Sequence, residues 1–381
     1  MANNDKVVVT NEKQGFFSKM SSSFSGIIVG ILLLIGGVAL LWSNEQNNVK
    51  NIKNVKELRD QVVDVVSSEV DDSNEGKLIA TTGKLNYGES TITDSLFNIS
   101  AQTPVLERTV EIYQWVEESE TKDDKTTYTY SKEWSEKLID SSDFNTPTGH
   151  ENPVEVKYES ERFETEETLK VGEFSLISSF KKLLPASKNV AIEEGIVLPE
   201  GYTVYNNKYI TTSADAANPV VGDVRISYKK NNYKEVSVLG KQKGDTIGEY
   251  TTKKNTNIKK LVEGETNGAG MINSIESANK MMKWLSRILG SLLIIIGIGS
   301  ILGPITTLIG YIPFLGKIVN SMIGVVSFLI GLVISLVIIA IAWFAARPIV
   351  SIILLVVIVG LIIALVFYKK NKAVPTEKTN E

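Results

Sequence analysis

Long uncharged apolar stretches lie near both ends of the chain, and most polar residues lie between them. The first stretch, residues 24–42, contains no charged residue. A helix rises about 1.5 Å per residue, so a stretch of this length matches a hydrocarbon core of about 30 Å. Three further apolar stretches lie near the C-terminus, at 288–303, 318–346 and 349–368. The pattern predicts four transmembrane helices, one N-terminal and three C-terminal.

Two details of these stretches affect their interpretation. The residues that end the first stretch, Trp42-Ser43-Asn44-Glu45, lack the small-x-small pattern of a signal-peptide cleavage site. We therefore interpret residues 24–42 as an uncleaved anchor. Near the C-terminus, Pro304 and Pro313 interrupt the apolar pattern. Residues 304–317 are expected either to extend the second span or to form a re-entrant turn packed against other helices.

Basic residues close to the span ends predict the orientation of the chain. If the spans alternate, one side of the membrane receives Lys19, Lys317, Lys369, Lys370 and Lys372. The positive-inside rule then places both termini in the cytoplasm. The predicted parts are a cytoplasmic tail (1–23), transmembrane helix 1 (24–42), an extracytoplasmic domain (43–283), a three-span bundle (284–368) and a second cytoplasmic tail (369–381).

Small residues recur at every fourth position within the predicted spans, which places them on one helix face. These helix-packing candidates are Gly26, Gly30, Gly299, Gly303, Ser327 and Gly331. Their spacing lets helix backbones approach closely, either between copies of the chain or inside one chain. No acidic residue lies in any span, which disfavours a proton relay or an ion-coupled transporter.

The polar central segment has the pattern of a β-rich domain between two amphipathic helices. Residues 44–70 and 271–285 show helical periodicity, and we expect them to lie either in the headgroup layer or on the domain. Alternating apolar and polar positions predict strands at 78–80, 108–117, 128–134, 154–158, 190–198, 202–210, 220–228 and 235–239. A helix is predicted over 174–184, and a turn at Asn206-Asn207. The predicted fold class is an α+β membrane protein with a large β-rich extracytoplasmic domain.

Charge and composition exclude several classes of function. The chain has 40 basic and 44 acidic residues, so no excess of positive charge predicts a nucleic-acid partner. It has no cysteine, which excludes thiolate metal sites and iron–sulfur clusters, and it has a single histidine. Residues from Asp71 resemble the start of a calcium loop, but Thr82 stands where the closing glutamate is needed. We therefore expect no cofactor and no metal.

Three residues are weak candidates for chemistry or binding, each with an ordinary structural alternative. His150 lies in a turn-rich segment and is either a general base or a hydrogen-bonded loop residue. Glu117 belongs to glutamate-rich segments that either supply an acid–base pair or coat a solvated surface. Trp115 is one of several aromatic residues that either form a ligand platform or pack across strands. The sequence assigns no catalytic residue.

Short motifs occur along the chain in a characteristic order. They are Asn44-Glu45, Asn74-Glu-Gly-Lys-Leu78, Tyr113-Gln-Trp-Val-Glu117, Gly149-His-Glu-Asn-Pro153 and Val221-Gly-Asp-Val-Arg-Ile-Ser227. In this order, and with the three-span tail that contains Arg347-Pro348, the chain resembles the transmembrane protein 43 family, also called LUMA. The resemblance covers nearly the whole chain.

The resemblance implies a four-span protein with both termini cytoplasmic or nucleoplasmic and one large lumenal or extracytoplasmic domain. Animal members are proteins of the endoplasmic reticulum and the inner nuclear membrane that self-associate and organise membrane protein complexes with emerin and lamins. No catalytic residue comes with the family. The lysine- and asparagine-rich, cysteine-free composition suits a bacterial member in the plasma membrane. For such a member the resemblance implies the topology and the scaffold role, but not the nuclear partners.

The leading hypothesis from the sequence is a non-enzymatic membrane scaffold. Its spans lie in the lipid bilayer and assemble several copies into a homo-oligomer, while its extracytoplasmic domain binds an unidentified membrane protein. One alternative is an extracytoplasmic hydrolase that uses His150 or the glutamates. Another is a channel subunit whose spans line a pore in an oligomer.

Overall fold

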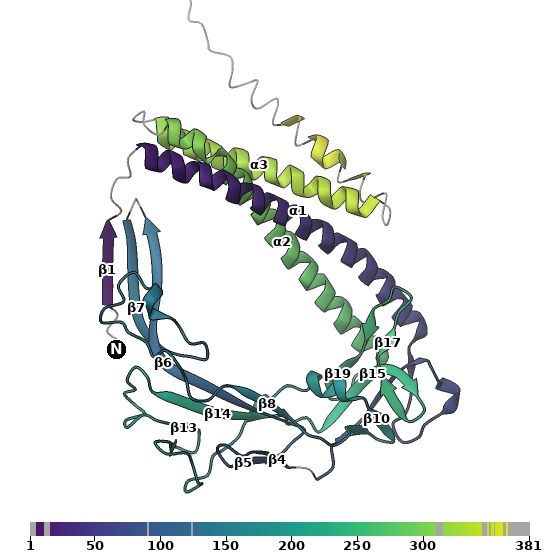
Figure 1. Ribbon diagram of the computed structural model, residues 1–381. Coiled ribbons are helices and arrows are strands. Elements are labelled where there is room, and N and C mark those ends of the chain that lie inside the picture. The colour runs from purple at the N-terminus through teal and green to yellow at the C-terminus, as the bar shows by residue number, and fades with distance from the viewer. Residues whose placement is uncertain are drawn as a thin grey trace, which may run out of the picture. The chain divides into compact units, whose positions relative to one another are not determined.

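The computed structural model describes residues 5–10, 16–89, 91–122, 125–309 and 315–344, together with 349, 352–353, 355–360 and 363–364. The chain forms two compact units. The β-rich unit contains Met1–Glu12 and Asp60–Met271, and the helical unit contains Lys13–Arg59 and Ile272–Glu381. Figure 1 labels the helices and strands.

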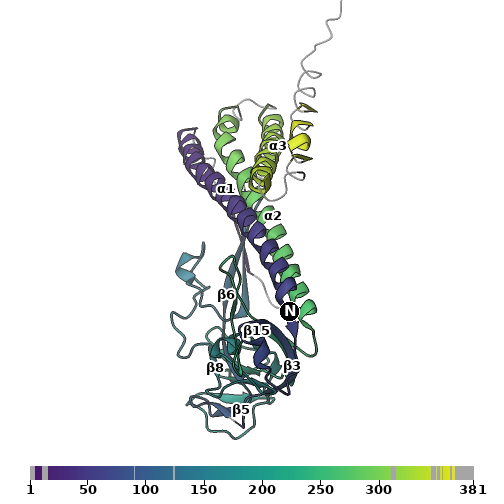
Figure 2. The same cartoon turned by 90° about the vertical axis from the view of Figure 1, so that its right-hand side faces the viewer.

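Three long helices dominate the helical unit: α1 (Phe16–Gln61), α2 (Gly268–Ile309) and α3 (Leu315–Phe344). Each contains a stretch long and apolar enough to cross a membrane, which agrees with three of the four predicted spans. α2 continues through Pro304 to Ile309, so the first part of residues 304–317 extends the second span. Of the predicted span 349–368, the structure describes only 349, 352–353, 355–360 and 363–364, so the fourth span stays a prediction. Figure 2 shows α1 crossing α2.

Glycines let α1 and α2 approach each other closely. A Cβ atom built on Gly30 would lie 2.6 Å from the carbonyl oxygen of Gly297, and one built on Gly37 would lie 2.8 Å from that of Gly290. Any larger residue would force the two backbones apart. The buried apolar core beside this contact consists of Leu41, Ile294 and Ile298.

The helix that leaves the first span ends earlier than the sequence pattern predicts. Residues 44–61 are helical as expected, but the chain then enters β2 (Val63–Asp64). This strand pairs in parallel with β3 (Leu78–Asn86). The change follows a run of valines from Val62, because β-branched side chains lose rotamer freedom in helices and pack well in strands. The prediction of helix over 62–70 is therefore wrong.

One sheet of the β-rich unit closes on itself. Its strand order is β19, β15, β16, β10, β9, β3 and β2, and β15 also pairs with β3. The strands not yet given are β9 (Lys170–Val171), β10 (Phe174–Leu176), β15 (Glu235–Lys243), β16 (Thr246–Gly248) and β19 (Lys260–Glu263). The closed part surrounds an apolar core that includes Leu169, Phe174 and Val238.

A second sheet carries the candidate residues. Its strand order is β1, β7, β6, β14, β13 and β12, with β8 paired to β6 and β11 paired to β14. These strands are β1 (Asp5–Thr10), β6 (Val105–Lys122), β7 (Lys125–Ser135), β8 (Glu161–Glu164), β11 (Lys188–Asn189), β12 (Thr203–Tyr205), β13 (Tyr209–Thr211) and β14 (Val224–Lys230). The remaining elements are β4 (Thr91–Asp94), β5 (Ile99–Gln102), β17 (Tyr250–Thr251), β18 (Asn257–Ile258) and the 3-10 helices η1 (Asp72–Asn74), η2 (Ser141–Asp143) and η3 (Ser178–Leu183).

The longest predicted strands are confirmed. Residues 108–117 lie in β6 and 128–134 lie in β7, and these two strands pair antiparallel. The predicted turn at Asn206-Asn207 joins β12 to β13, and its two residues have φ values of 50° and 55°. Positive φ at both central positions is typical of a two-residue hairpin turn, and asparagine tolerates this conformation better than most residues.

Three further predicted elements are wrong. Residues 174–184 form no α-helix but β10 followed by η3, because β10 completes the closed sheet between β9 and β16. Phe174 and Leu176 are buried, and a short apolar run of this kind fits a strand as well as a helix. Residues 154–158 form no strand, and the pairing with β6 is made further along by β8. Residues 190–198 form no strand either, because the pairing with β14 is made just before them by the short β11.

The N-terminal segment forms a strand of the second sheet. β1 pairs antiparallel with β7, from Asp5 opposite Tyr130 to Thr10 opposite Lys125. β7 would otherwise offer an unpaired edge, and an added strand satisfies its backbone groups. The positive-inside rule predicts a cytoplasmic tail over residues 1–23, and this prediction and the pairing of β1 with β7 exclude one another.

A buried ion pair crosses the second sheet. Arg108 of β6 donates from Nη1 to Asp94 Oδ2 over 2.5 Å, and the hydroxyl of Tyr228 on β14 donates to the same oxygen over 2.6 Å. Burial, the largest single effect, would lower the pKa of Arg108, but the hydrogen bond to Asp94 and the charge interactions with Asp94, Tyr228 and Glu161 together raise it. Burial and the bond to Asp94 also raise the pKa of Tyr228. The pair fixes the β4–β5 hairpin to the sheet that carries the candidate residues.

Candidate functional site

The structure brings together the three side chains that the sequence analysis selected. Trp115 and Glu117 lie two positions apart on β6 and therefore on one face of the sheet. His150 lies in the loop that follows β7, and Tyr130 of β7 stands opposite Glu117 in the strand register. We call these four residues the His150 cluster.

Hydrogen bonds join the loop to the two strands. The Tyr130 hydroxyl donates to Glu117 Oε2 over 2.6 Å and accepts from the backbone N–H of Thr146 over 3.0 Å. The same carboxylate oxygen accepts from the backbone N–H of Asn145 over 2.6 Å. Burial, followed by the bond to Glu117, raises the pKa of Tyr130. The hydroxyl therefore stays protonated and remains a donor at neutral pH.

His150 is enclosed by aromatic rings. His150 is 6% exposed, and its ring stacks on Tyr130 with the ring centroids 3.8 Å apart. Trp115 meets the same ring edge-on at 4.7 Å. Nδ1 of His150 lies 2.9 Å from the carbonyl oxygen of Thr146, and a carbonyl can only accept, so Nδ1 carries a proton.

Asn152 holds the end of the same loop against β6. Its side-chain oxygen accepts from the backbone N–H of Trp115 over 2.7 Å, and its nitrogen donates to the Trp115 carbonyl over 2.9 Å. The contacts of the His150 cluster therefore fix residues 144–152 to β6 and β7. Within the described ranges, no group of histidine, aspartate and glutamate side chains is arranged to hold a metal ion.

A second polar cluster lies inside the helical unit. Glu45 of α1 is fully buried, and it accepts from Nε and Nη2 of Arg287 on α2 over 2.6 and 2.8 Å. Trp343 of α3 donates its indole N–H to the same carboxylate. The guanidinium of Arg287 also lies 5.0 Å from the ring centroid of Trp284. We call Glu45, Arg287 and Trp343 the Glu45 cluster.

The Glu45 cluster joins all three described long helices through one carboxylate. A buried charge costs several kcal/mol unless it is paired, and the fork of an arginine matches the two oxygens of a carboxylate. Glu45 follows the first span by a few residues, and Arg287 directly precedes the second. The cluster therefore lies where the apolar parts of these helices begin and end.

No local pattern in the sequence predicts the Glu45 cluster, and Asn44-Glu45 stands out there only as a short motif. The partners of Glu45 lie 242 and 298 positions away in the chain, so no local periodicity connects them. One signal was available. An acidic and a basic residue flank two predicted spans on the same side of the membrane, where pairing between spans is favourable.

The predicted helix-packing residues have different surroundings. A Cβ atom on Gly30 would collide with α2, and one on Gly331 would lie 2.6 Å from the side chain of Ile295. Gly26 and Gly299 have room for ordinary contact, with nearest atoms at 3.8 and 3.7 Å. A Cβ atom on Gly303 meets no described atom within 4 Å. The last residue of the set, Ser327, is buried.

Comparisons with known proteins find relatives along most of the chain. The family model of transmembrane protein 43 matches residues 112–348. Transmembrane protein 43 of Mus musculus is 25% identical over 364 residues, which cover 90% of each chain. The Homo sapiens protein is 24% identical over 360 residues, which cover 90% of this chain and 89% of the human one. The Drosophila melanogaster homolog is 26% identical over 342 residues, with 85% and 89% covered. No solved structure matches the chain.

Replacing Tyr130 by phenylalanine tests the structural role of the His150 cluster. The change removes the hydroxyl that serves Glu117 and the Thr146 N–H, and we expect a loss of about 1–3 kcal/mol of stability. Thermal unfolding of the purified full-length protein measures this loss as a fall of several degrees. Tyr128→Phe, at a half-buried position on the same strand, is the control and should change little. Equal unfolding temperatures for the two variants would contradict the role.

The difference in stability between the unaltered protein and Tyr130→Phe should depend on pH. The pKa of Tyr130 is raised in the folded state, so the contribution of its hydroxyl is complete below the unfolded value of about 10. This contribution is lost as the pH rises through the folded pKa. The difference in stability between the unaltered protein and Tyr130→Phe should therefore be constant near neutral pH and shrink above about pH 10.

Proposed function

Because the chain belongs to the transmembrane protein 43 family and carries apolar helices that can span a membrane, we propose that it is a multi-pass membrane scaffold. In this function its helices assemble several copies, and its β-rich unit binds a protein partner on the extracytoplasmic side. The observation that carries the proposal is the Glu45 cluster, which ties α1, α2 and α3 into one body. A scaffold needs such a fixed body to present the same surfaces to each partner.

Small residues support the assembly of copies. Gly30, Gly37 and Gly331 are used in close contacts within the chain, whereas a Cβ atom on Gly299 would make only ordinary contact with Ser327 and one on Gly303 would meet no described atom within 4 Å. These two glycines lie four residues apart on α2 and therefore on one helix face. Without a hydrophobic drive between helices in lipid, close backbone contact at such positions is a main source of helix association.

The β-rich unit offers a surface for a protein partner. Tyr113 and Trp134 face each other across β6 and β7 with ring centroids 5.3 Å apart. Arg225 of β14 lies 4.5 Å above the Trp134 ring and binds both oxygens of Glu111 over 2.7 and 2.8 Å. A cavity of about 470 Å³ adjoins them, lined in part by Tyr209. Aromatic and arginine side chains on a fixed sheet are the residues most enriched in protein interfaces.

The self-association of copies is tested by enlarging Gly299 and Gly303. Gly299→Leu and Gly303→Leu keep the helix but hold a neighbouring helix away, so we expect each to weaken the oligomer about tenfold or more. Native mass spectrometry in mild detergent, together with crosslinking in membranes, measures the oligomeric state. Gly324→Leu on α3 is the matched control, because its Cβ position is also open among the described residues. A strictly monomeric protein, or oligomers that all three variants leave unchanged, would contradict the proposal.

The orientation is tested by single cysteines, because the natural chain has none. A membrane-impermeant maleimide added to intact cells should label Glu193→Cys in the β-rich unit. Lys6→Cys and Lys372→Cys should be labelled only after the cells are permeabilised, as the lysine pattern predicts. Labelling of Lys6→Cys from outside would instead mean that β1 stays paired with β7 in the membrane, and the predicted N-terminal orientation would be overturned.

A further inference from the structure

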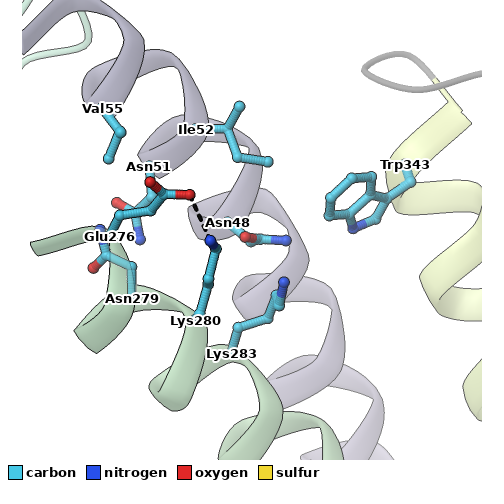
Figure 3. A pocket seen from close by; sticks show the side chains of 9 residues that line it. All are labelled: Asn48, Asn51, Ile52, Val55, Glu276, Asn279, Lys280, Lys283 and Trp343. Atoms are coloured by element: carbon cyan, nitrogen blue, oxygen red, sulfur yellow. Dashed lines mark ion pairs between the residues drawn. The ribbon is translucent and has the colours of Figure 1, made fainter. Parts of the chain in front are cut away.

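A polar cavity lies between the helices of the helical unit. Its volume is about 190 Å³, and it is lined from α1 by Asn48, from α2 by Glu276, Lys280 and Lys283, and from α3 by Trp343. Figure 3 shows the ends of Asn48, Lys280 and Lys283 gathered on one side, with Trp343 facing them across the opening. The cavity therefore collects one amide and two ammonium groups beside an indole ring.

Asn48 is the most informative residue of this cavity. It is 8% exposed, and its side-chain nitrogen has no hydrogen-bond partner among the described residues. A buried amide without a partner costs about 1–3 kcal/mol, and such groups in native proteins generally satisfy a ligand, an ion or a water molecule. In Figure 3 the side chain of Asn48 points across the cavity toward Trp343. The cavity therefore presents a donor without an acceptor.

The charges around the cavity favour an anion. Glu276 is the one carboxylate in its lining, and it is held by Lys280 over 2.7 Å and by Arg59 over 2.5 Å. Both cations remain close to it, so its charge is more than compensated, and Lys283 adds a further positive charge. The charge of Arg287 nearby is compensated by Glu45. The acceptor that fits Asn48 should therefore be an anionic oxygen.

An apolar groove continues from the polar cavity. It lies between α2 and α3, has a volume of about 560 Å³ and shares Lys283 and Trp343 with the cavity. Its other walls include Ile288, Leu292 and Phe328. A ligand that fills both spaces must carry an anionic group at one end and a hydrocarbon chain at the other.

Tryptophans indicate the depth of the cavity in the membrane. Trp42, Trp284 and Trp343 lie at the ends of the apolar stretches of α1, α2 and α3, and tryptophan is enriched at the membrane–water interface. Asn48 follows Trp42 by six positions, or about 9 Å along a helix. The headgroup layer reaches about 5–8 Å beyond the hydrocarbon core on each side. The cavity, which is lined by both Trp343 and Asn48, thus spans the headgroup layer up to its outer edge, and the groove continues toward the hydrocarbon.

We propose that one anionic phospholipid binds here, with its phosphate accepting from Asn48 and paired with Lys283, and with an acyl chain in the groove between α2 and α3. Basic pockets between transmembrane helices are suited to such headgroups. The bound lipid supplies the acceptor that Asn48 lacks. It also contacts Trp343, which lines both spaces and donates to Glu45, so the lipid and the Glu45 cluster stabilise the same helix arrangement.

Thermal unfolding of the full-length protein in nonionic detergent tests the site with three probes: dioleoyl phosphatidylglycerol, dioleoyl phosphatidylcholine and inorganic phosphate. We expect the phosphatidylglycerol to raise the unfolding temperature and to bind about tenfold or more tighter than the phosphatidylcholine. Inorganic phosphate should neither stabilise the protein nor compete. Equal binding of the two lipids would overturn the proposal, and competition by inorganic phosphate would identify a free-anion site instead.

Variants separate binding from folding. Asn48→Leu should leave the lipid-free protein at least as stable as before, because it removes an unpartnered buried amide, yet lose the response to phosphatidylglycerol. Lys283→Gln should weaken binding about tenfold, and Lys283→Arg should retain most of it. Lys53→Gln, an exposed lysine outside the cavity lining, is the matched control. An unchanged lipid response in both Asn48→Leu and Lys283→Gln would overturn the proposal.

Discussion

The helical unit depends on one carboxylate that is buried among apolar helices. Glu45 has no exposed surface, so its charge must be satisfied by the protein, and Arg287 and Trp343 supply all the donors described for its two oxygens apart from its neighbour Asn44. Sliding or rotating α1 or α2 by a fraction of a turn would leave a charge unpaired, and moving α3 would remove the indole N–H that donates to the same carboxylate. The cost of an unpaired buried charge, several kcal/mol, therefore fixes the register of α1 and α2, and the Trp343 hydrogen bond joins α3 to them.

Other features of the helical unit follow from this register. It places Gly30 and Gly37 of α1 against the α2 backbone, where only glycine fits. It also places Trp343 where it donates to Glu45 and lines both the polar cavity and the groove. The proposed scaffold and the proposed lipid site thus rest on the same fixed arrangement, although one concerns copies of the protein and the other concerns a single phospholipid.

Local patterns predicted the parts of the fold that depend on local physics. Apolar length identified the spans in α1, α2 and α3, and alternation identified β6 and β7. Long-range pairing was not predictable in this way. Residues 174–184 carry apolar positions that fit a helix, yet the closed sheet needs β10 there. His150, Glu117 and Trp115 were each identifiable as polar or aromatic exceptions, but their packing around Tyr130 depends on the β6–β7 register. The Glu45 cluster depends on three helices at once.

The measurement that tests this account most directly is a double-mutant cycle at Glu45 and Arg287 in lipid nanodiscs, read by thermal unfolding. Arg287→Met alone should lower the free energy of unfolding by about 3–5 kcal/mol, because it leaves the buried Glu45 carboxylate without its ion-pair partner. Glu45→Leu combined with Arg287→Met should recover most of that loss, since no charge is left without a partner. Single substitutions that cost little, or costs that simply add in the double variant, would show that the carboxylate does not hold the three helices together.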